Sequence, residues 1–146
     1  MSEPLRIVVV EDEALIVMQL EILLEEAGHE VVGTAVSARD AVAVARRTRP
    51  DIVLIDLQLK GGSSGLDVAK HLADEPAMML VFLTANASGF HDDFAGAVAV
   101  IAKPFSEAII GNTMVFLEEC IRTPPPVSPL PLGLRLAPGY LDSLAG

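Results

Sequence analysis

Five short apolar runs recur along this 146-residue chain, and helical patterns lie between them. Each run is continuous rather than alternating, which is typical of strands buried on both faces, as in a parallel sheet. The runs are rich in Val and Ile, which favour strands. The sequence therefore predicts a layered α/β domain. The predicted strands are residues 6–10, 30–35, 52–55, 78–83 and 97–102.

Segments with the apolar spacing of amphipathic helices separate these strands. An apolar stripe over residues 14–27 ends at Gly28, and a second over 38–48 is followed by a proline. Ser64 and Asp67 have the spacing of a capping box at the start of a third helix. This alternation predicts a doubly wound α/β domain whose five-stranded parallel sheet has right-handed crossovers. The predicted helices are residues 14–27, 38–48, 65–74, 88–95 (short) and 107–121.

The segment 123–146 is different in kind, because prolines occupy many of its positions from 124 to 138. Proline removes a backbone donor and fixes φ, so residues 123–138 are not expected to form a regular helix and are expected to run extended. The whole segment is also too short to form a domain of its own. We therefore expect a folded domain over residues 1–122 and a proline-rich C-terminal tail over 123–146.

Composition and charge exclude several classes of function. The formal net charge is −10, so the surface repels nucleic-acid phosphate. Arg46, Arg47 and Arg49 cluster at the end of a predicted helix, where cations complement the helix dipole. No apolar run approaches the roughly 18 residues of a membrane span, and no signal-peptide pattern opens the chain. Cys120 is the only cysteine, which suits a reducing cytoplasm. We expect no nucleic-acid or membrane partner.

Polar side chains follow four of the predicted strands at the point where each strand ends. Glu11 and Asp12 follow the first strand, Asp56 the third, Thr84 the fourth and Lys103 the fifth. In an open parallel sheet the carboxyl ends of the strands meet at one edge, where functional groups collect. We therefore expect three carboxylates, one hydroxyl and one ammonium to converge there.

Each residue also has a structural interpretation. Asp12 and Glu13 can cap the helix that follows them, where negative charge is favourable. Asp56 can be an N-cap, Thr84 a simple β-branched strand residue and Lys103 a solvated charge. Their joint occurrence, each at its own strand end, favours a functional site.

Three carboxylates in one pocket raise one another's pKa unless a cation lies among them. A hard divalent ion with oxygen ligands, Mg²⁺, meets this need. Asp56 is then suited to accept a phosphoryl group as an acyl phosphate. Lys103 would offset the charge of the transferring group, and the Thr84 hydroxyl would hydrogen-bond one of its oxygens.

These residues resemble those of the receiver domains of two-component response regulators. The resemblance covers roughly residues 5–121 and rests on four motifs. They are the acidic pair in "VVVEDE", Asp56 in "DIVLIDLQL", Thr84 in "FLTAN" and Lys103 in "AKPF". The resemblance implies a flavodoxin-like sheet of strand order 2-1-3-4-5 and a stand-alone, single-domain regulator.

Carried over by position, the resemblance implies that Asp56 is the phosphoacceptor, acting with Thr84 and Lys103. Glu11, Asp12 and Asp56 would hold Mg²⁺, Asp12 directly and Glu11 mostly through water. The backbone carbonyl of Gln58 would add a further ligand. The peptide bond before Pro104 is often cis in such proteins. The implied donor is a histidine kinase or a histidine phosphotransfer protein, and the protein would catalyse only its own phosphorylation and dephosphorylation rather than act as an enzyme.

Two features depart from the common receiver pattern. Many receivers carry an aromatic residue three positions before the lysine, where this chain has Val100. The loop after Asp56 is also longer and richer in glycine, as in a receiver subgroup often found with bacterial kinases of less typical histidine-kinase classes.

Output is expected through contact with an unknown downstream protein, because no output domain follows residue 121. The last predicted helix carries a second apolar strip of Ile109, Phe116 and Cys120. Either the tail covers this strip, through Leu130, Leu132, Leu134 and Leu136, or the strip is a dimer or partner surface, with or without exchange of the tail.

Two rival functions stay open from the residues. An aspartyl-phosphate phosphohydrolase usually needs a second carboxylate two residues after the nucleophile, where this chain has Gln58. A non-phosphorylated pseudo-receiver is the other rival, and Val100 and the altered loop are compatible with it.

Overall fold

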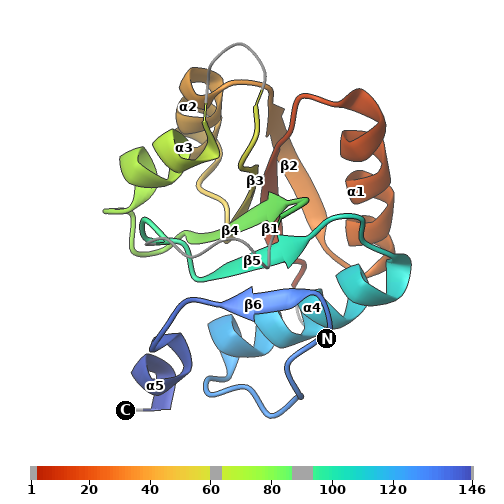
Figure 1. Ribbon diagram of the computed structural model, residues 1–146, viewed down its shortest axis with the longest axis vertical. Coiled ribbons are helices and arrows are strands. Elements are labelled where there is room, and N and C mark those ends of the chain that lie inside the picture. Colours follow the sequence, from red (N-terminus) through yellow and green to blue (C-terminus); the bar gives the residue numbers. More distant parts are fainter. Residues whose placement is uncertain (1–2, 60–63, 87–93, 146) are drawn as a thin grey trace.

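The computed structural model describes residues 3–59, 64–86 and 94–145, and its strands and helices alternate through most of the chain (Figure 1). In chain order they are β1 (Arg6–Val10), α1 (Ala14–Glu26), β2 (Glu30–Ala35), α2 (Ala38–Thr48), β3 (Ile52–Asp56), α3 (Gly65–Leu72), β4 (Met79–Thr84), β5 (Ala99–Ala102), α4 (Glu107–Arg122), β6 (Leu134–Leu136) and α5 (Tyr140–Ala145).

One sheet organises the molecule, and its strand order is β2-β1-β3-β4-β5-β6. The first five strands pair in parallel, which confirms the expected doubly wound sheet and its 2-1-3-4-5 order. The sheet is larger than the five strands expected from the sequence, because β6 adds a sixth strand. This strand comes from the tail and pairs antiparallel with β5.

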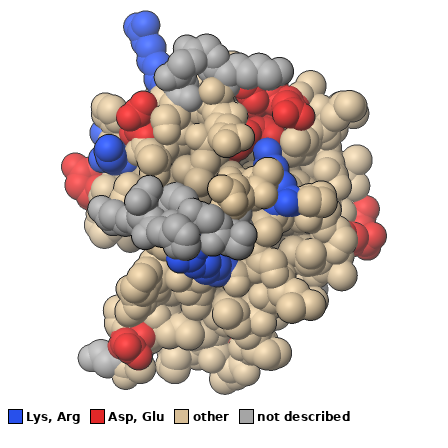
Figure 2. All heavy atoms as spheres, in the orientation of Figure 1, with Lys and Arg blue, Asp and Glu red and all other residues tan. Residues whose placement is uncertain are grey.

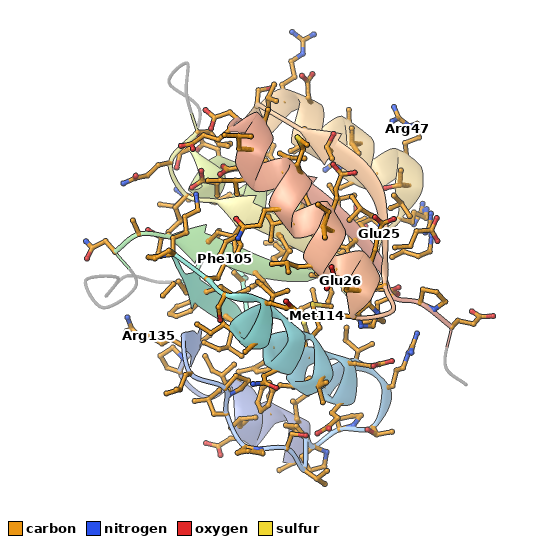
Figure 3. All side chains as sticks on the ribbon, turned by 90° about the vertical axis from the view of Figure 1, so that its right-hand side faces the viewer. Glu25, Glu26, Arg47, Phe105, Met114 and Arg135 are labelled. Carbon is orange, nitrogen blue, oxygen red and sulfur yellow. The ribbon has the colours of Figure 1, made fainter. Side chains whose placement is uncertain are left out.

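Helices cover both faces of the sheet. On one face α1 and α4 lie side by side, as Figure 3 shows, and their apolar residues pack with Ile7, Leu54 and Leu83 of the strands. On the other face α2 and α3 pack against Val8, Val53 and Phe82. Successive strand residues therefore alternate between two buried layers, which explains why the runs in the sequence are continuous rather than alternating.

The boundaries predicted from the sequence hold closely for most elements. β1, β2 and α2 match, whereas β3 and β4 each extend to include the polar residue that follows, Asp56 and Thr84. The fifth strand is shorter than expected and begins at Ala99. The helix predicted over 88–95 falls almost entirely outside the described residues and stays a prediction.

The tail is more regular than an extended segment. Residues 134–136 form β6, and residues 140–145, after the proline-rich stretch, form a short helix. Residues 123–138 themselves form no helix, as expected, but they are not extended throughout. Pro138 and Gly139 precede the short helix, so no proline interrupts it. Of the four leucines proposed to cover α4, Leu134 is buried and Leu136 half-buried, but Leu130 and Leu132 are exposed.

Candidate functional site

The carboxyl ends of β1, β3, β4 and β5 lie along one edge of the sheet, and the expected charged side chains gather there. β1 and β3 are neighbours in parallel register, with Val10 opposite Ile55, so Glu11 and Asp56 follow paired positions. Lys103 follows β5, two strands away from β3, and reaches the cluster with its long side chain. Figure 2 shows acidic side chains gathered near the start of α1.

The acidic trio is compact. Glu11, Asp12 and Asp56 each offer a carboxylate oxygen, and these oxygens all lie within 4.8 Å of one another. Glu11 is fully buried and Asp56 nearly so, whereas Asp12 is partly exposed. The Lys103 Nζ lies 3.0 Å from Glu11 Oε1 and 3.3 Å from Asp56 Oδ2. The single Lys103 ammonium group thus forms ion pairs with two buried carboxylates.

Burial and crowding perturb the charges of the site. Burial, together with a hydrogen bond to Asp56, raises the pKa of Glu11 to about 7, although Lys103 acts in the opposite direction. Burial by itself lowers the pKa of Lys103, but the carboxylates of Glu11 and Asp56 outweigh this, and the pKa of Lys103 is raised. The negative charge of the three carboxylates is therefore larger than the single Lys103 ammonium can neutralise.

A buried oxygen indicates what the cluster lacks. Glu11 Oε2 is inaccessible to solvent and has no hydrogen-bond partner among the described residues. An unpaired carboxylate oxygen in the interior is costly unless a donor or a cation lies beside it. The trio also offers only hard oxygen ligands, which Mg²⁺ prefers. The residues present thus fit a divalent cation such as Mg²⁺.

Contacts with the backbone position both the side chain and the carbonyl of Asp56, and they were not foreseen from the sequence. The Gln58 N–H donates to Asp56 Oδ1 over 2.9 Å. Gly65, at the start of α3, lies so close that a Cβ there would be 2.4 Å from the Asp56 carbonyl oxygen. The one available sequence signal was the glycine-rich loop itself, since close backbone approach requires glycine.

Thr84 and Lys103 are joined through the backbone at the end of β4. The Lys103 N–H donates to the Thr84 carbonyl over 2.8 Å, and the Thr84 hydroxyl accepts the Asn86 N–H over 3.2 Å. Thr84 is itself nearly buried. The peptide bond between Lys103 and Pro104 is cis, as the receiver resemblance implied.

The capping interpretation accounts for neither Glu13 nor Asp56. Glu13 occupies the N-cap position of α1, but its side chain makes no capping hydrogen bond among the described residues. Asp56 is the last residue of β3, and α3 is capped instead by Ser64, whose hydroxyl accepts the Leu66 N–H.

Val100 occupies the position where many receivers carry an aromatic residue. Its side chain is fully buried and packs with Phe82 and Phe94 on the α2–α3 side of the sheet. On β6, Arg135 lies opposite Val100, and its guanidinium sits 5.9 Å from the centre of the Phe94 ring. Apolar groups therefore already fill this position.

The parallel sheet and its charged edge define a flavodoxin-like α/β domain with an acidic site. The profile of the response regulator receiver domain matches residues 7–114, and the chain belongs to this family. It is 38% identical over 122 residues to the phyllosphere-induced regulator PhyR of Methylorubrum extorquens, an alignment that covers 80% of this chain and 46% of that protein.

Solved structures of relatives have the same fold. The receiver domain of Erythrobacter litoralis PhyR matches with a TM-score of 0.69 and 27% identity, over 88% of this chain and 97% of that one. A mutant of PhyR from Bartonella quintana, described as an anti-anti-sigma factor, matches with a TM-score of 0.64 and 29% identity, over 80% of this chain and 50% of that one.

The chain spans about half the length of the curated relatives it matches. Within the described ranges, none of the helices combines the length and the apolar character needed to cross a membrane.

Proposed function

We propose that this chain is a phosphoacceptor of a two-component phosphorelay in the cytoplasm. Asp56 takes a phosphoryl group from a histidine kinase or a histidine phosphotransfer protein in a Mg²⁺-dependent reaction. One observation carries the proposal: the nearly buried Asp56 carboxylate lies 3.3 Å from the Lys103 ammonium and beside the carboxylates of Glu11 and Asp12. An aspartate with a purely structural role needs one partner, whereas Asp56 lies among a positively charged ammonium group and two further carboxylates.

The reaction is a displacement at phosphorus. An oxygen of the Asp56 carboxylate forms a bond to phosphorus as the bond from phosphorus to the donor nitrogen breaks, which leaves imidazole and an aspartyl phosphate. Lys103, already in contact with Asp56, is placed to pair with an oxygen of the incoming group. The Thr84 hydroxyl lies at the same edge and would donate to another phosphoryl oxygen, while it keeps accepting from Asn86.

Glu11, Asp12 and Asp56 would hold the magnesium ion, with the backbone carbonyl of Gln58 as a further ligand. The bound ion supplies positive charge that offsets the phosphoryl oxygens and the crowded carboxylates. The unpartnered Glu11 Oε2 supports this assignment, since it is a buried acceptor in need of positive charge. The Gln58 N–H meanwhile orients Asp56 through its Oδ1 atom.

A surface suited to the phosphoryl donor adjoins the site. Leu15, Met18 and Ile22 form an exposed apolar stripe on α1, and the first of them is 80% exposed. Only Glu13 separates the acidic pair from the first residue of α1, so this stripe begins close to the site. A pocket of about 340 Å³ lies next to it, lined by Ile16, Gln19, Ala85, Lys103, Pro104 and Phe105. A helical phosphohistidine protein could rest here while its histidine reaches Asp56.

Output is proposed to occur by contact with another protein. The description of Bartonella quintana PhyR as an anti-anti-sigma factor supports this mode for a relative of this chain. The net charge of −10 also disfavours direct binding to nucleic acid.

Incubation with acetyl phosphate and Mg²⁺, followed by intact mass spectrometry, tests the proposal. We expect one phosphoryl adduct in the native chain and none in Asp56→Asn or without Mg²⁺. Asp51→Asn is a matched control, because Asp51 lies at the opposite end of the same strand, where its Oδ2 accepts the Arg6 N–H. An unmodified native chain under conditions of demonstrated Mg²⁺ binding would favour the pseudo-receiver instead.

A further inference from the structure

The end of the tail forms a cover over one side of the domain (Figure 1). The cover, residues 134–145, comprises β6 and α5. β6 closes the outer edge of β5, where Ala102 N–H donates to the Gly133 carbonyl and Ala137 N–H to the Val98 carbonyl. Leu134 is buried in the same cluster as the α4 side chains, and Tyr140 and Leu144 pack against that cluster.

The cover lies over the second apolar strip of α4, Ile109, Phe116 and Cys120. At one end of the strip a Cβ on Gly133 would be 3.3 Å from Ile109, and at the other the Tyr140 side chain hydrogen-bonds Cys120. Phe116 lies between them on the same side of the helix and is 2% exposed. Without the cover, this strip and the edge of β5 would face water, which is unfavourable for both.

The cover is a small unit with few anchors of its own. β6 has three residues, and α5 has six, none of them buried. Short elements with little buried surface open at low free-energy cost compared with the core of a domain. We therefore expect the cover to open more readily than the five parallel strands.

The connection to the cover consists of a fixed part and a hinge. Glu119 on α4 holds the fixed part, because its carboxylate accepts the N–H groups of Val127 and Ser128, each over 2.9 Å, and the Ser128 hydroxyl over 2.6 Å. The hinge, residues 129–133, follows and contains two prolines, which favour an extended backbone. It also exposes Leu130 and Leu132, the latter by 87%.

We infer that the cover exchanges between two copies of this chain, so that residues 134–145 of each copy occupy β5 and α4 of the other. The contacts within the single chain identify the segment that occupies this surface of β5 and α4. The surface fits residues 134–145, and every copy of the chain carries these residues. A dimer with exchanged covers makes the same cover contacts as the monomer. The equilibrium between monomer and dimer therefore depends on the conformation of the hinge and on the protein concentration. Straightened hinges of two copies would also run side by side, which lets Leu130 and Leu132 bury apolar surface that one chain leaves in water.

Cross-linking at the cover tests the exchange. Cys120 is the only cysteine, and Tyr140 contacts it, so Tyr140→Cys places a thiol pair across the interface. Monomer and dimer fractions of this variant are separated by size and treated with a short bifunctional thiol reagent, which we expect to reach Cys120 once the Tyr140 ring is removed. We expect the link within one chain in the monomer and between two chains in the dimer. A dimer whose links stay within each chain, or no dimer at the highest soluble concentration, would overturn the inference.

Two further variants keep the test decisive. Cys120→Ser with Tyr140→Cys is the control, and it should lose the link in the monomer. Leu130→Ser with Leu132→Ser leaves the buried contacts intact, and we expect it to lower the dimer fraction several-fold. In the native chain the Cys120 thiol should resist a thiol reagent equally in monomer and dimer. Rapid reaction in the dimer would show an uncovered strip and contradict exchange, even if Tyr140→Cys disturbs docking.

Discussion

The Lys103 ammonium lies 3.0 Å from the Oε1 of Glu11, a residue 92 positions earlier in the chain. The fold brings these two residues together because β1 and β5 both end at the same edge of the sheet. Lys103 also contacts Asp56, so it acts as an internal cation for a cluster that otherwise contains only carboxylates. An external cation would have to compete with it for the negative charge of the same carboxylates.

Lys103→Met should therefore change stability and metal binding in opposite directions. Without metal, it leaves Glu11 buried and unpaired, and we expect a loss of about 1–3 kcal/mol in the free energy of unfolding. Mg²⁺ should bind more tightly, because its competitor is gone, and should restore much of that loss. Urea denaturation with a chelator and with Mg²⁺ measures both effects. Arg46→Met is the control, since it removes only exposed contacts, an ion pair with Glu75 and a hydrogen bond to the His71 carbonyl. Unchanged Mg²⁺ affinity in Lys103→Met would contradict the competition.

Gly65→Ala should damage the site through its backbone. The new Cβ would meet the Asp56 carbonyl oxygen at 2.4 Å, so the loop or α3 must shift. We expect a loss of about 1–3 kcal/mol and weaker Mg²⁺ binding. Gly111→Ala is the matched control, because no described atom outside the neighbouring backbone of α4 lies within 4 Å of the new Cβ. That substitution should stabilise the protein by about 0.5–1 kcal/mol. Equal effects of the two substitutions in thermal unfolding would show that the close approach does not matter.

Val100→Phe tests whether an aromatic residue fits at the family's aromatic position. Val100 is fully buried among Phe82, Phe94 and other apolar groups, so the larger ring overpacks the core. We expect a loss of about 1–3 kcal/mol. Val115→Phe, at a half-exposed position on α4, should change stability by less than about 0.5 kcal/mol. If Val100→Phe were as stable as the native chain, the packing described for this position would be wrong.

His29 should make stability depend on pH. The residue is buried, its Nδ1 accepts the Leu5 N–H over 3.1 Å, and burial lowers its pKa below the usual 6.5, although Glu118 acts in the opposite direction. The unfolded chain therefore binds a proton more readily than the folded chain. This contribution to stability is fully present above about pH 6.5 and is lost as the pH falls below it.

Urea denaturation at about pH 7.5 and about pH 5.5 checks this sign. The native chain should lose more free energy of unfolding on acidification than His29→Asn, whose amide oxygen can still accept the Leu5 N–H. Parallel losses in the two proteins would assign the pH dependence to other groups.

The sequence predicted the parallel strands and the charged edge because both follow from local patterns. Continuous apolar runs specify strands buried on both faces, and the polar residue after each run marks the strand end. Asp56 and Lys103 could thus be assigned to the same site from the sequence, without any measured distance between them. The contacts of Asp56 with Gln58 and Gly65 could not, because they depend on the path of the backbone.

β6 was missed for a different reason. Leu134–Leu136 is a three-residue strand between Gly133 and Pro138, and nearby prolines dominate the local pattern. The free edge of β5 and the apolar strip of α4 select the strand, and both are tertiary features. The strip itself could be read from Phe116 and Cys120, which is why a covering role for the tail could be predicted.

Chemical trapping of the phosphorylated residue tests the central claim most directly. After reaction with acetyl phosphate and Mg²⁺, borohydride reduces an aspartyl phosphate to homoserine, and peptide mass spectrometry locates the reduced residue. We predict homoserine at position 56 and unmodified aspartate at position 12. Homoserine at position 12 in place of 56, or no reduced residue at all in a chain shown to bind Mg²⁺, would contradict the assignment of Asp56 as the phosphoacceptor.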